Sequence, residues 1–278
     1  MKIVFFGTPE LSVPVLQALI TASNINVVAV VTQPDKPVGR KQELTPPPVK
    51  VVADSAGIPV WQFSTLKNPE AVAQLSSVEA DAFVVFAYGK MIPDDVLSIP
   101  RLGCLNLHPS LLPAYRGPAP INAPILNGDS ETGVTIMLLD SGMDTGPILA
   151  QTNVAVASDD TAETLGDRLI AIGAPLLVET LQKYADGEIK PQTQKEEGIT
   201  ITKKLDREDG LIVKGEDPTT IDRKIRAYFP WPGCYTIIKH NGLDLRVKLL
   251  PKSMVQPEGK SPMTLPEFER GYGPLSLQ

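Results

Sequence analysis

The sequence is poor in the residues that build metal sites and disulfide frameworks. Its 278 residues include two cysteines, Cys104 and Cys234, and two histidines, His108 and His240. The cysteines stand in different contexts, which argues against a disulfide framework and favours a reducing, cytoplasmic setting. Because His and Cys are few and far apart, we expect no dedicated zinc site and no other bound metal.

Long hydrophobic runs and nucleotide-binding motifs are also missing. No stretch approaches the roughly 18 apolar residues of a membrane span, so we expect no membrane attachment. The apolar run in Met1–Gly7 has neither the length nor the cleavage site of a signal peptide, and we interpret it as a first strand. Neither G-x-G-x-x-G nor G-x-x-x-x-G-K-[ST] occurs, which removes the main support for a dinucleotide or nucleoside triphosphate site.

Positive charge is scarce in the first part of the chain. The net charge of −6 argues against a protein that coats nucleic acid non-specifically. Up to Lys204 there are 15 Lys+Arg against 22 Asp+Glu, whereas from Leu205 onward there are 11 against 10. The weakly basic tail leaves room for a local phosphate-binding surface.

What the sequence does contain is an alternation of apolar strands and helical segments. Lys2–Gly7 and the near-continuous apolar run Asn26–Thr32 flank a helical pattern, which is typical of a βαβ unit. Further strands are expected at Pro59–Gln62, Ala82–Ala87, Gly103–Leu107, Gly133–Leu138 and Ile148–Val156, and helices at Lys50–Gly57, Pro69–Ser76, Ala119–Leu126 and about 160–185. The pattern predicts an α/β fold, with a Rossmann-like, mostly parallel sheet covered by helices on both faces.

A polar segment divides the chain. We predict a catalytic domain at 1–189, a linker at 190–204 and a small C-terminal domain at 205–278. In the tail we expect a helix at Thr220–Phe229, a strand at Leu211–Lys214, a hairpin around Asn241-Gly242 and a last helix at Met263–Gly271. About three strands are too few for a closed barrel, so this domain is predicted to be a partly open β unit.

Residues 33–50 contain five prolines and one glycine, which predicts a long loop without regular structure. Arg40 and Lys41 lie near its middle. A solvated surface loop, a mobile lid and a nucleic-acid contact are all compatible with this composition.

Asn106, His108 and Asp144 are the candidates for chemistry. Asn106 and His108 are two residues apart at the end of a strand, so their side chains share one face. Asp144 follows a later strand, and in a parallel sheet it would reach the same edge. An amide, an imidazole and a carboxylate without a nucleophile suit direct acyl transfer to a bound amine, with Asn106 and His108 stabilising the oxyanion and Asp144 assisting His108 or accepting the amine's proton. Asp140 is the competing carboxylate in the same turn-rich loop.

Two potential nucleophiles are rejected on geometry. Cys104 is four residues from His108, about 13 Å along an extended strand, and is expected in the core. Ser110 lies beyond Pro109 and outside any G-x-S-x-G elbow, so a serine hydrolase is not expected.

Several motifs together resemble a known family. Asn106–Pro113 (Asn-Leu-His-Pro-Ser-Leu-Leu-Pro) with Tyr115-Arg-Gly117 resembles the N10-formyltetrahydrofolate-dependent formyltransferases, which act on methionyl-tRNA, phosphoribosylglycinamide or amino sugars. The stretches that resemble the methionyl-tRNA branch are Thr32–Arg40, Gly128–Met137, Met143–Gly146 and Phe229–Pro232.

The resemblance implies 10-formyltetrahydrofolate as co-substrate and initiator Met-tRNA as acceptor, for translation initiation. It implies Asn106, His108 and Asp144 as the catalytic triad. The folate site would comprise Ser110, Leu111, Leu112 and Pro113, with Tyr88 and Gly89 at a neighbouring strand end, and Arg40 and Lys41 would contact tRNA.

The second domain would be a reduced version of the family's oligonucleotide-binding-like barrel, shortened relative to the family. We expect a cytoplasmic monomer. The alternatives are a formyltransferase acting on an amino sugar nucleotide, a non-catalytic folate-binding module, and a hydrolase that releases formate.

Overall fold

The computed structural model describes residues 1–39 and 41–275. Two compact units make up the chain. Unit 1 comprises Met1–Arg116, Gly133–Asn153 and Asp167–Thr200, and unit 2 comprises Gly117–Thr132, Val154–Gly166 and the chain from Ile201 onward. The predicted domain limits at 189/190 and 204/205 remain a prediction.

A seven-stranded sheet forms the centre of unit 1, with the order β5-β2-β1-β6-β7-β8-β9. Its strands are β1 (Lys2–Phe6), β2 (Asn26–Val31), β5 (Val60–Trp61), β6 (Ala82–Val85), β7 (Cys104–His108), β8 (Glu131–Leu138) and β9 (Ile148–Ala155). The first five strands in chain order pair in parallel, whereas β7 and β8 are antiparallel. The predicted fold class, a mostly parallel sheet with helices, is confirmed.

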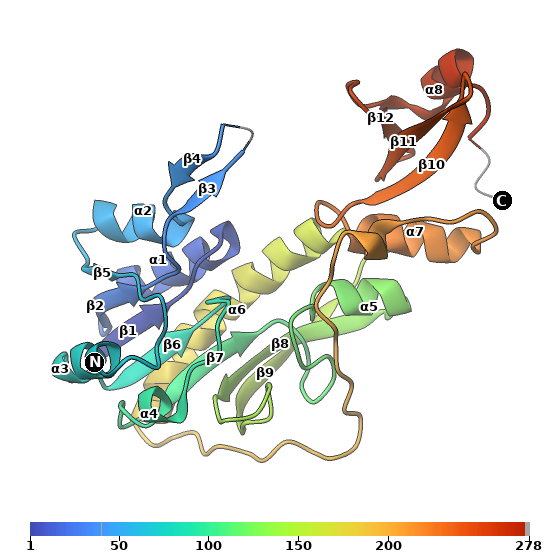
Figure 1. Ribbon diagram of the computed structural model, residues 1–278. Coiled ribbons are helices and arrows are strands. Elements are labelled where there is room, and N and C mark those ends of the chain that lie inside the picture. Colours follow the sequence, from blue (N-terminus) through green and yellow to red (C-terminus); the bar gives the residue numbers. More distant parts are fainter. Residues whose placement is uncertain (40, 276–278) are drawn as a thin grey trace. The chain divides into compact units, whose positions relative to one another are not determined.

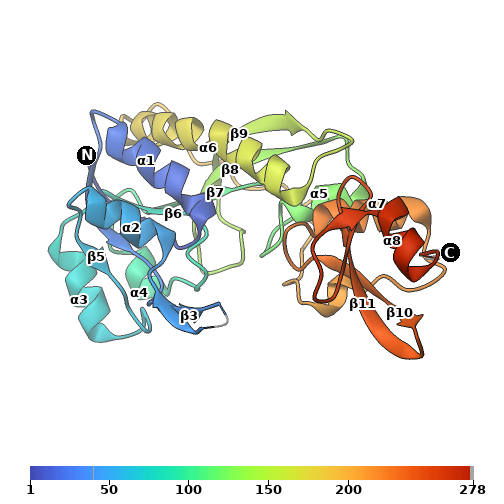
Figure 2. The ribbon, with the colours of Figure 1, turned by 90° about the horizontal axis from the view of Figure 1, so that it is seen from above.

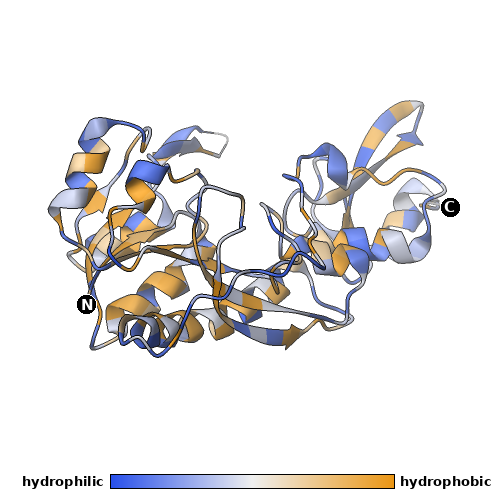
Figure 3. Ribbon diagram, turned by 90° about the horizontal axis from the view of Figure 1, so that it is seen from below, coloured by the Kyte–Doolittle hydropathy of each residue, from blue (hydrophilic) through white to orange (hydrophobic). Residues whose placement is uncertain are grey.

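Helices cover both faces of this sheet (Figures 1 and 2). The helices are α1 (Val13–Thr21), α2 (Pro48–Ser55), α3 (Pro69–Ser77), α4 (Asp94–Leu97) and α6 (Ala162–Ala185). In Figure 2, α1 and α6 lie on one side of the strands, and α3 and α4 on the other. Figure 3 shows why: the central strands are hydrophobic along their length, so both faces need a cover.

The core between the sheet and the helices α3 and α4 is tightly packed. Phe6, Phe83 and Cys104 of the sheet pack with Leu75 of α3 and Val96 of α4, and all five are buried. Cys104 is therefore a core residue, as the sequence predicts. The packing fixes the position of β7, whose last residue is His108.

The prediction for residues 33–50 was wrong. Residues 33–50 are not a loop without regular structure, because β3 (Lys36–Val38) and β4 (Glu43–Thr45) form a two-stranded antiparallel hairpin. All six strand residues are exposed, so no alternation of buried and exposed positions marks the hairpin in the sequence. Pro37 is tolerated there because a two-stranded ribbon has only edge strands.

Unit 2 contains a four-stranded antiparallel sheet with the order β10-β11-β12-β13. Its elements are α5 (Asn122–Asn127), α7 (Pro218–Ala227), β10 (Cys234–His240), β11 (Leu243–Leu250), β12 (Met254–Pro257), β13 (Met263–Thr264) and α8 (Leu265–Tyr272). The hairpin around Asn241-Gly242 is confirmed. The strand expected at Leu211–Lys214 is wrong, since only Leu211 makes an isolated bridge, and the short strands β12 and β13 were missed.

Candidate active site

The carboxyl end of β7 carries the two residues that the sequence singled out. Asn106 and His108 are buried, with exposed fractions of 8% and 4%. Burial of two polar side chains at a strand end is costly unless they are hydrogen-bonded or used by a ligand. Their partners therefore decide what this position can do.

The imidazole of His108 is held between a carbonyl and a carboxylate. Its Nε2 lies 2.9 Å from the backbone oxygen of Tyr115, and its Nδ1 lies 3.7 Å from Oδ1 of Asp144. Because a carbonyl oxygen only accepts, Nε2 carries the proton in this arrangement. Nδ1 is then the ring nitrogen that faces Asp144.

Burial lowers the pKa of His108 below its usual 6.5, although the Asp144 carboxylate and the Tyr115 carbonyl act in the opposite direction. The ring is therefore neutral at pH 7. A neutral ring with Nε2 protonated leaves the lone pair of Nδ1 available to accept a proton.

The side-chain amide of Asn106 is not used by the described part of the fold. The backbone of Asn106 pairs with the neighbouring strands, opposite Val85 and Met137. None of the described residues hydrogen-bonds to its side-chain nitrogen or oxygen. An amide that is carried by a buried residue at a strand end, and that has no partner in the described part of the chain, is suited to bind a substrate oxygen.

Asp144 reaches His108 by a route that the sequence did not predict. Because β8 runs antiparallel to β7, Leu138 at the end of β8 pairs with Leu105 near the start of β7. The loop from Leu139 to Pro147 folds back, and the N–H of Leu138 donates to the oxygen of Pro147 at 2.9 Å. Asp144 meets His108 through this return, not through a shared carboxyl edge.

The same loop shows what Asp140 does. Its Oδ1 accepts hydrogen bonds from the N–H of Gly142 at 3.0 Å and from Oγ1 of Thr145 at 2.7 Å. These bonds shape the turn around Asp144. Asp140 is thus committed to the loop itself.

The segment Ser110–Pro113 is held by Thr135 of β8, whose side chain is fully buried. Oγ1 of Thr135 donates to the oxygen of Ser110 at 2.6 Å and accepts from the N–H of Leu112 at 3.1 Å. Nε2 of Gln151 donates to the oxygen of Leu112 at 2.8 Å and to Oγ1 of Thr135 at 2.9 Å. The loop next to His108 is therefore rigid at its backbone.

Tyr88 and Gly89 follow β6, which pairs in parallel with β7, so they lie at the same sheet edge as His108. The oxygen of Tyr88 accepts from Nε2 of Gln33 and from Oγ1 of Thr8, both at 3.0 Å. The described residues offer no acceptor for the N–H groups of Tyr88 and Gly89. These donors are available to a ligand beside the candidate catalytic residues.

Neither rejected nucleophile is activated. Burial raises the pKa of the Cys104 thiol to about 12, so it stays protonated at pH 7. The hydroxyl of Ser110 donates to the oxygen of Ala114 at 2.6 Å. The site therefore offers an amide, an imidazole and a carboxylate, and chemistry that runs without a protein nucleophile.

Comparisons with known proteins agree with this arrangement. The sequence profile of the family described as "Formyl transferase" matches residues 1–181. The chain belongs to the formyl transferase family.

Curated relatives narrow the match. The chain is 50% identical over 247 residues to the methionyl-tRNA formyltransferase of Chloroflexus aurantiacus, an alignment that covers 89% of this chain and 79% of the relative. It is 43% identical over 300 residues to the methionyl-tRNA formyltransferase of Roseiflexus castenholzii, covering 98% and 96%. The resemblance deduced from the motifs, and the enzyme class it implies, are confirmed.

Solved structures agree on the fold. A sugar N-formyltransferase from a Shewanella species superposes with a TM-score of 0.68 and 17% identity, covering 91% of this chain and 98% of that one. At this identity the likeness supports the architecture and not the substrate.

Two residues, Arg40 and Lys41, were expected to contact tRNA. Lys41 is exposed in the turn between β3 and β4, and Arg40 lies outside the described residues.

In the described part of the chain, no group of three or more His, Cys, Asp and Glu is arranged to hold a metal ion. None of the described helices is long and apolar enough to cross a membrane.

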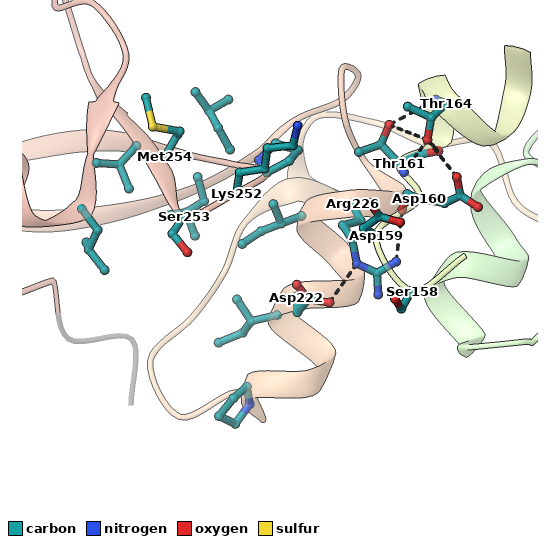
Figure 4. Close-up of a pocket in the computed structure, with 18 of the residues that line it drawn as sticks. Ser158, Asp159, Asp160, Thr161, Thr164, Asp222, Arg226, Lys252, Ser253 and Met254 are labelled. Carbon is teal, nitrogen blue, oxygen red and sulfur yellow. Dashed lines mark hydrogen bonds and ion pairs between the residues drawn. The ribbon is translucent and has the colours of Figure 1, made fainter. Parts of the chain in front are cut away.

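A cavity of about 760 Å³ lies within unit 2 (Figure 4). The residues that line it include the carboxylates Asp159, Asp160 and Asp222 and the apolar residues Met254 and Leu265. None of the predicted catalytic or folate-binding residues lines it, so it is separate from the candidate active site.

The sequence reasoning missed the residues that hold the site in place, Thr135, Gln151, Gln194 and Thr200. Gln151, Gln194 and Thr200 are ordinary polar residues outside the motifs, whereas Thr135 lies inside the Gly128–Met137 motif without being singled out there. The partners of all four are 16 to 85 positions away in the chain. No local pattern signals such contacts.

Proposed function

We propose that this chain transfers the formyl group of 10-formyltetrahydrofolate to the α-amino group of methionine on initiator tRNA. The single observation that carries the proposal is the side-chain amide of Asn106, a buried residue. This amide has no partner among the described residues and lies at the strand end that carries His108, the partner of Asp144. The identity to enzymes named methionyl-tRNA formyltransferase supports the choice of acceptor.

The residues next to His108 fit a folate. The backbone N–H groups of Tyr88 and Gly89, for which the described residues offer no acceptor, suit the amide-like edge of a pterin. The fixed backbone of Ser110–Pro113 provides a preformed wall. When bound, the folate would supply an activated formyl group and a nitrogen leaving group.

Each catalytic residue then has a role that follows from its surroundings. The N–H of the Asn106 side chain donates to the oxygen of the formyl group, where negative charge develops during attack by the amine. The pair formed by Nδ1 of His108 and the carboxylate of Asp144 accepts the proton that the attacking amine loses, and returns it to the leaving nitrogen. The hydrogen bond from Nε2 to Tyr115 holds the ring in the tautomer that this role requires.

The remaining parts of the proposal rest on the resemblance. Arg40 and Lys41 contact the tRNA, and the C-terminal domain, 205–278, binds its backbone. The enzyme acts as a monomer in the cytoplasm. The 300 aligned positions with the Roseiflexus relative exceed the 278 residues of this chain, so that relative contains internal residues absent here. We therefore expect fewer phosphate contacts and a shallower salt dependence of tRNA binding than in that relative.

The decisive experiment measures formyl transfer from 10-formyltetrahydrofolate to charged initiator tRNA, with an amino sugar nucleotide as the competing acceptor. We expect transfer to the tRNA alone, and loss of turnover with retained folate binding in His108→Ala. Transfer to the amino sugar, formate release without an acceptor, or folate binding without any turnover in the wild type would each overturn the proposal.

A further inference from the structure

Asp144, whose carboxylate faces His108, and Tyr115, whose backbone oxygen accepts from His108, both have an unusual backbone conformation. Asp144 has φ of 54° and Tyr115 has φ of 61°, both in the left-handed region that non-glycine residues rarely adopt. Such residues cost about 1 kcal/mol or more and persist only where their surroundings hold them. The surroundings of Asp144 and Tyr115 must therefore hold both residues in this conformation.

Both are held by one segment, Gln192–Thr200, which has the polar composition of a linker. Gln194 is buried, with an exposed fraction of 8%. Its Nε2 donates to the backbone oxygens of Asp144 and Gly146, each at 2.8 Å. The side-chain amide of Gln194 thus holds the backbone of Asp144, the residue whose carboxylate faces His108.

The other end of the segment holds Tyr115. The N–H of Tyr115 donates to Oγ1 of Thr200 at 2.7 Å, and the N–H of Arg116 donates to the oxygen of Thr200 at 3.0 Å. These bonds fix the peptide groups on both sides of Tyr115, including the one whose carbonyl accepts the proton on His108.

A further contact joins the two ends. Oε1 of Gln194 accepts from Nε and a terminal nitrogen of Arg116, at 3.1 and 2.7 Å. Arg116 directly follows Tyr115, so the loop of Asp144 and the backbone of Tyr115 are connected through one side chain. The segment is itself anchored to the sheet, because Gln192 and Ile148 exchange backbone hydrogen bonds.

We propose that Gln194 and Thr200 are positioning residues for the proposed formyl transfer, and that the segment Gln192–Thr200 sets the geometry of the His108–Asp144 pair. Gln194 places the carboxylate and Thr200 places the carbonyl that selects the tautomer of His108. The inference rests on the proposed function only for its kinetic readout, since the geometry of the pair is measurable without turnover.

Gln194→Glu tests whether Gln194 places the Asp144 carboxylate. Glutamate keeps an acceptor for Arg116 but removes both donors to the loop of Asp144 and directs an oxygen at two carbonyl oxygens. We expect kcat to fall about 10²-fold, as for a displacement of roughly 1 Å in a reacting group, with KM for folate and for tRNA within about twofold. Gln192→Glu is the matched control, because its side chain is exposed and makes no hydrogen bond to the described residues, and it should leave kcat unchanged.

Substitutions of Thr200 test whether this residue places the Tyr115 carbonyl. Thr200→Val removes the acceptor of the Tyr115 N–H and should lower kcat about tenfold, less than Gln194→Glu because this site is exposed to water. Thr200→Ser retains the hydroxyl and should restore kcat. Thr193→Val, at an exposed residue of the same segment, controls for the substitution.

A readout independent of activity separates this inference from the proposed function. The chain has only two histidines, so NMR titration of His108 can be assigned with His240→Asn. The Asp144 carboxylate raises the pKa of His108, and its displacement in Gln194→Glu should lower that pKa further. Folded Gln194→Glu with the wild-type kcat and the wild-type His108 pKa would overturn the inference. If this variant does not fold, Thr200→Ser as slow as Thr200→Val would overturn it. An inactive wild type with a shifted His108 pKa in Gln194→Glu would refute the function alone.

Discussion

The hydroxyl of Thr135 fixes the proposed folate loop, and its removal has a calculable cost. Thr135→Val keeps the shape of the side chain in β8 and deletes Oγ1. The backbone oxygen of Ser110 and the N–H of Leu112 then lose their partner inside the protein. Gln151 loses one of its two bonds but retains the one to the oxygen of Leu112.

The magnitude follows from the burial of these groups. Thr135 and Ser110 are fully buried and Leu112 nearly so, so water cannot replace the hydroxyl without opening the loop. An unsatisfied buried backbone group costs about 1–3 kcal/mol. With two such groups, we expect the free energy of unfolding to fall by about 3 kcal/mol, within the roughly 5–15 kcal/mol of a typical domain. The relaxed loop should also raise KM for folate more than it lowers kcat.

Two measurements check this prediction: urea denaturation for stability, and KM for 10-formyltetrahydrofolate at saturating tRNA. Thr132→Val is the control in the same strand, because Thr132 is 3% exposed and its hydroxyl has no partner among the described residues. That substitution should be neutral or stabilising. A loss below about 1 kcal/mol in Thr135→Val, with KM unchanged, would refute the reasoning.

Three further predictions concern the catalytic residues and their loop. Asn106→Ala should lower kcat about 10²–10³-fold, as expected for loss of an oxyanion donor, with little change in stability because no described residue bonds to its amide; a drop below tenfold in single-turnover assays would exclude that role. The lowered pKa of His108 means that activity should persist below pH 6.5 and fall only at the folded pKa, and Asp144→Asn should shift this acid limb of the kcat/KM profile to lower pH as well as lowering kcat. Protonation of His108 is less favourable in the folded state, so its contribution to stability is full above pH 6.5 and decreases as pH falls through 6.5 toward the folded pKa. Gly146→Ala should lower both Tm and kcat, because a Cβ there would lie 1.9 Å from the backbone oxygen of Leu138, and a wild-type Tm would contradict that geometry.

Local patterns in the sequence determined the elements and the candidate residues. Continuous apolar runs predicted the buried strands, because a sheet covered on both faces needs them. The spacing of Asn106 and His108 placed both on one face, because side chains alternate along a strand. The hairpin β3–β4 escaped because its residues are all exposed and leave no alternating pattern.

Only the tertiary structure decided how the site is assembled. Because β8 runs antiparallel to β7, the loop that carries Asp144 starts near the beginning of β7, far from His108 at its end. The loop returns toward His108 and is held there by hydrogen bonds from Gln194, which is 50 residues from Asp144 and 48 from Gly146. The tautomer of His108 depends on the Tyr115 carbonyl, which Thr200 holds from 85 residues away. Such contacts join single polar groups whose partners lie far apart in the chain, so no periodicity of the sequence records them. The sequence by itself determined which side chains stand at the end of β7; the fold determined which atoms of His108 and Asp144 face each other.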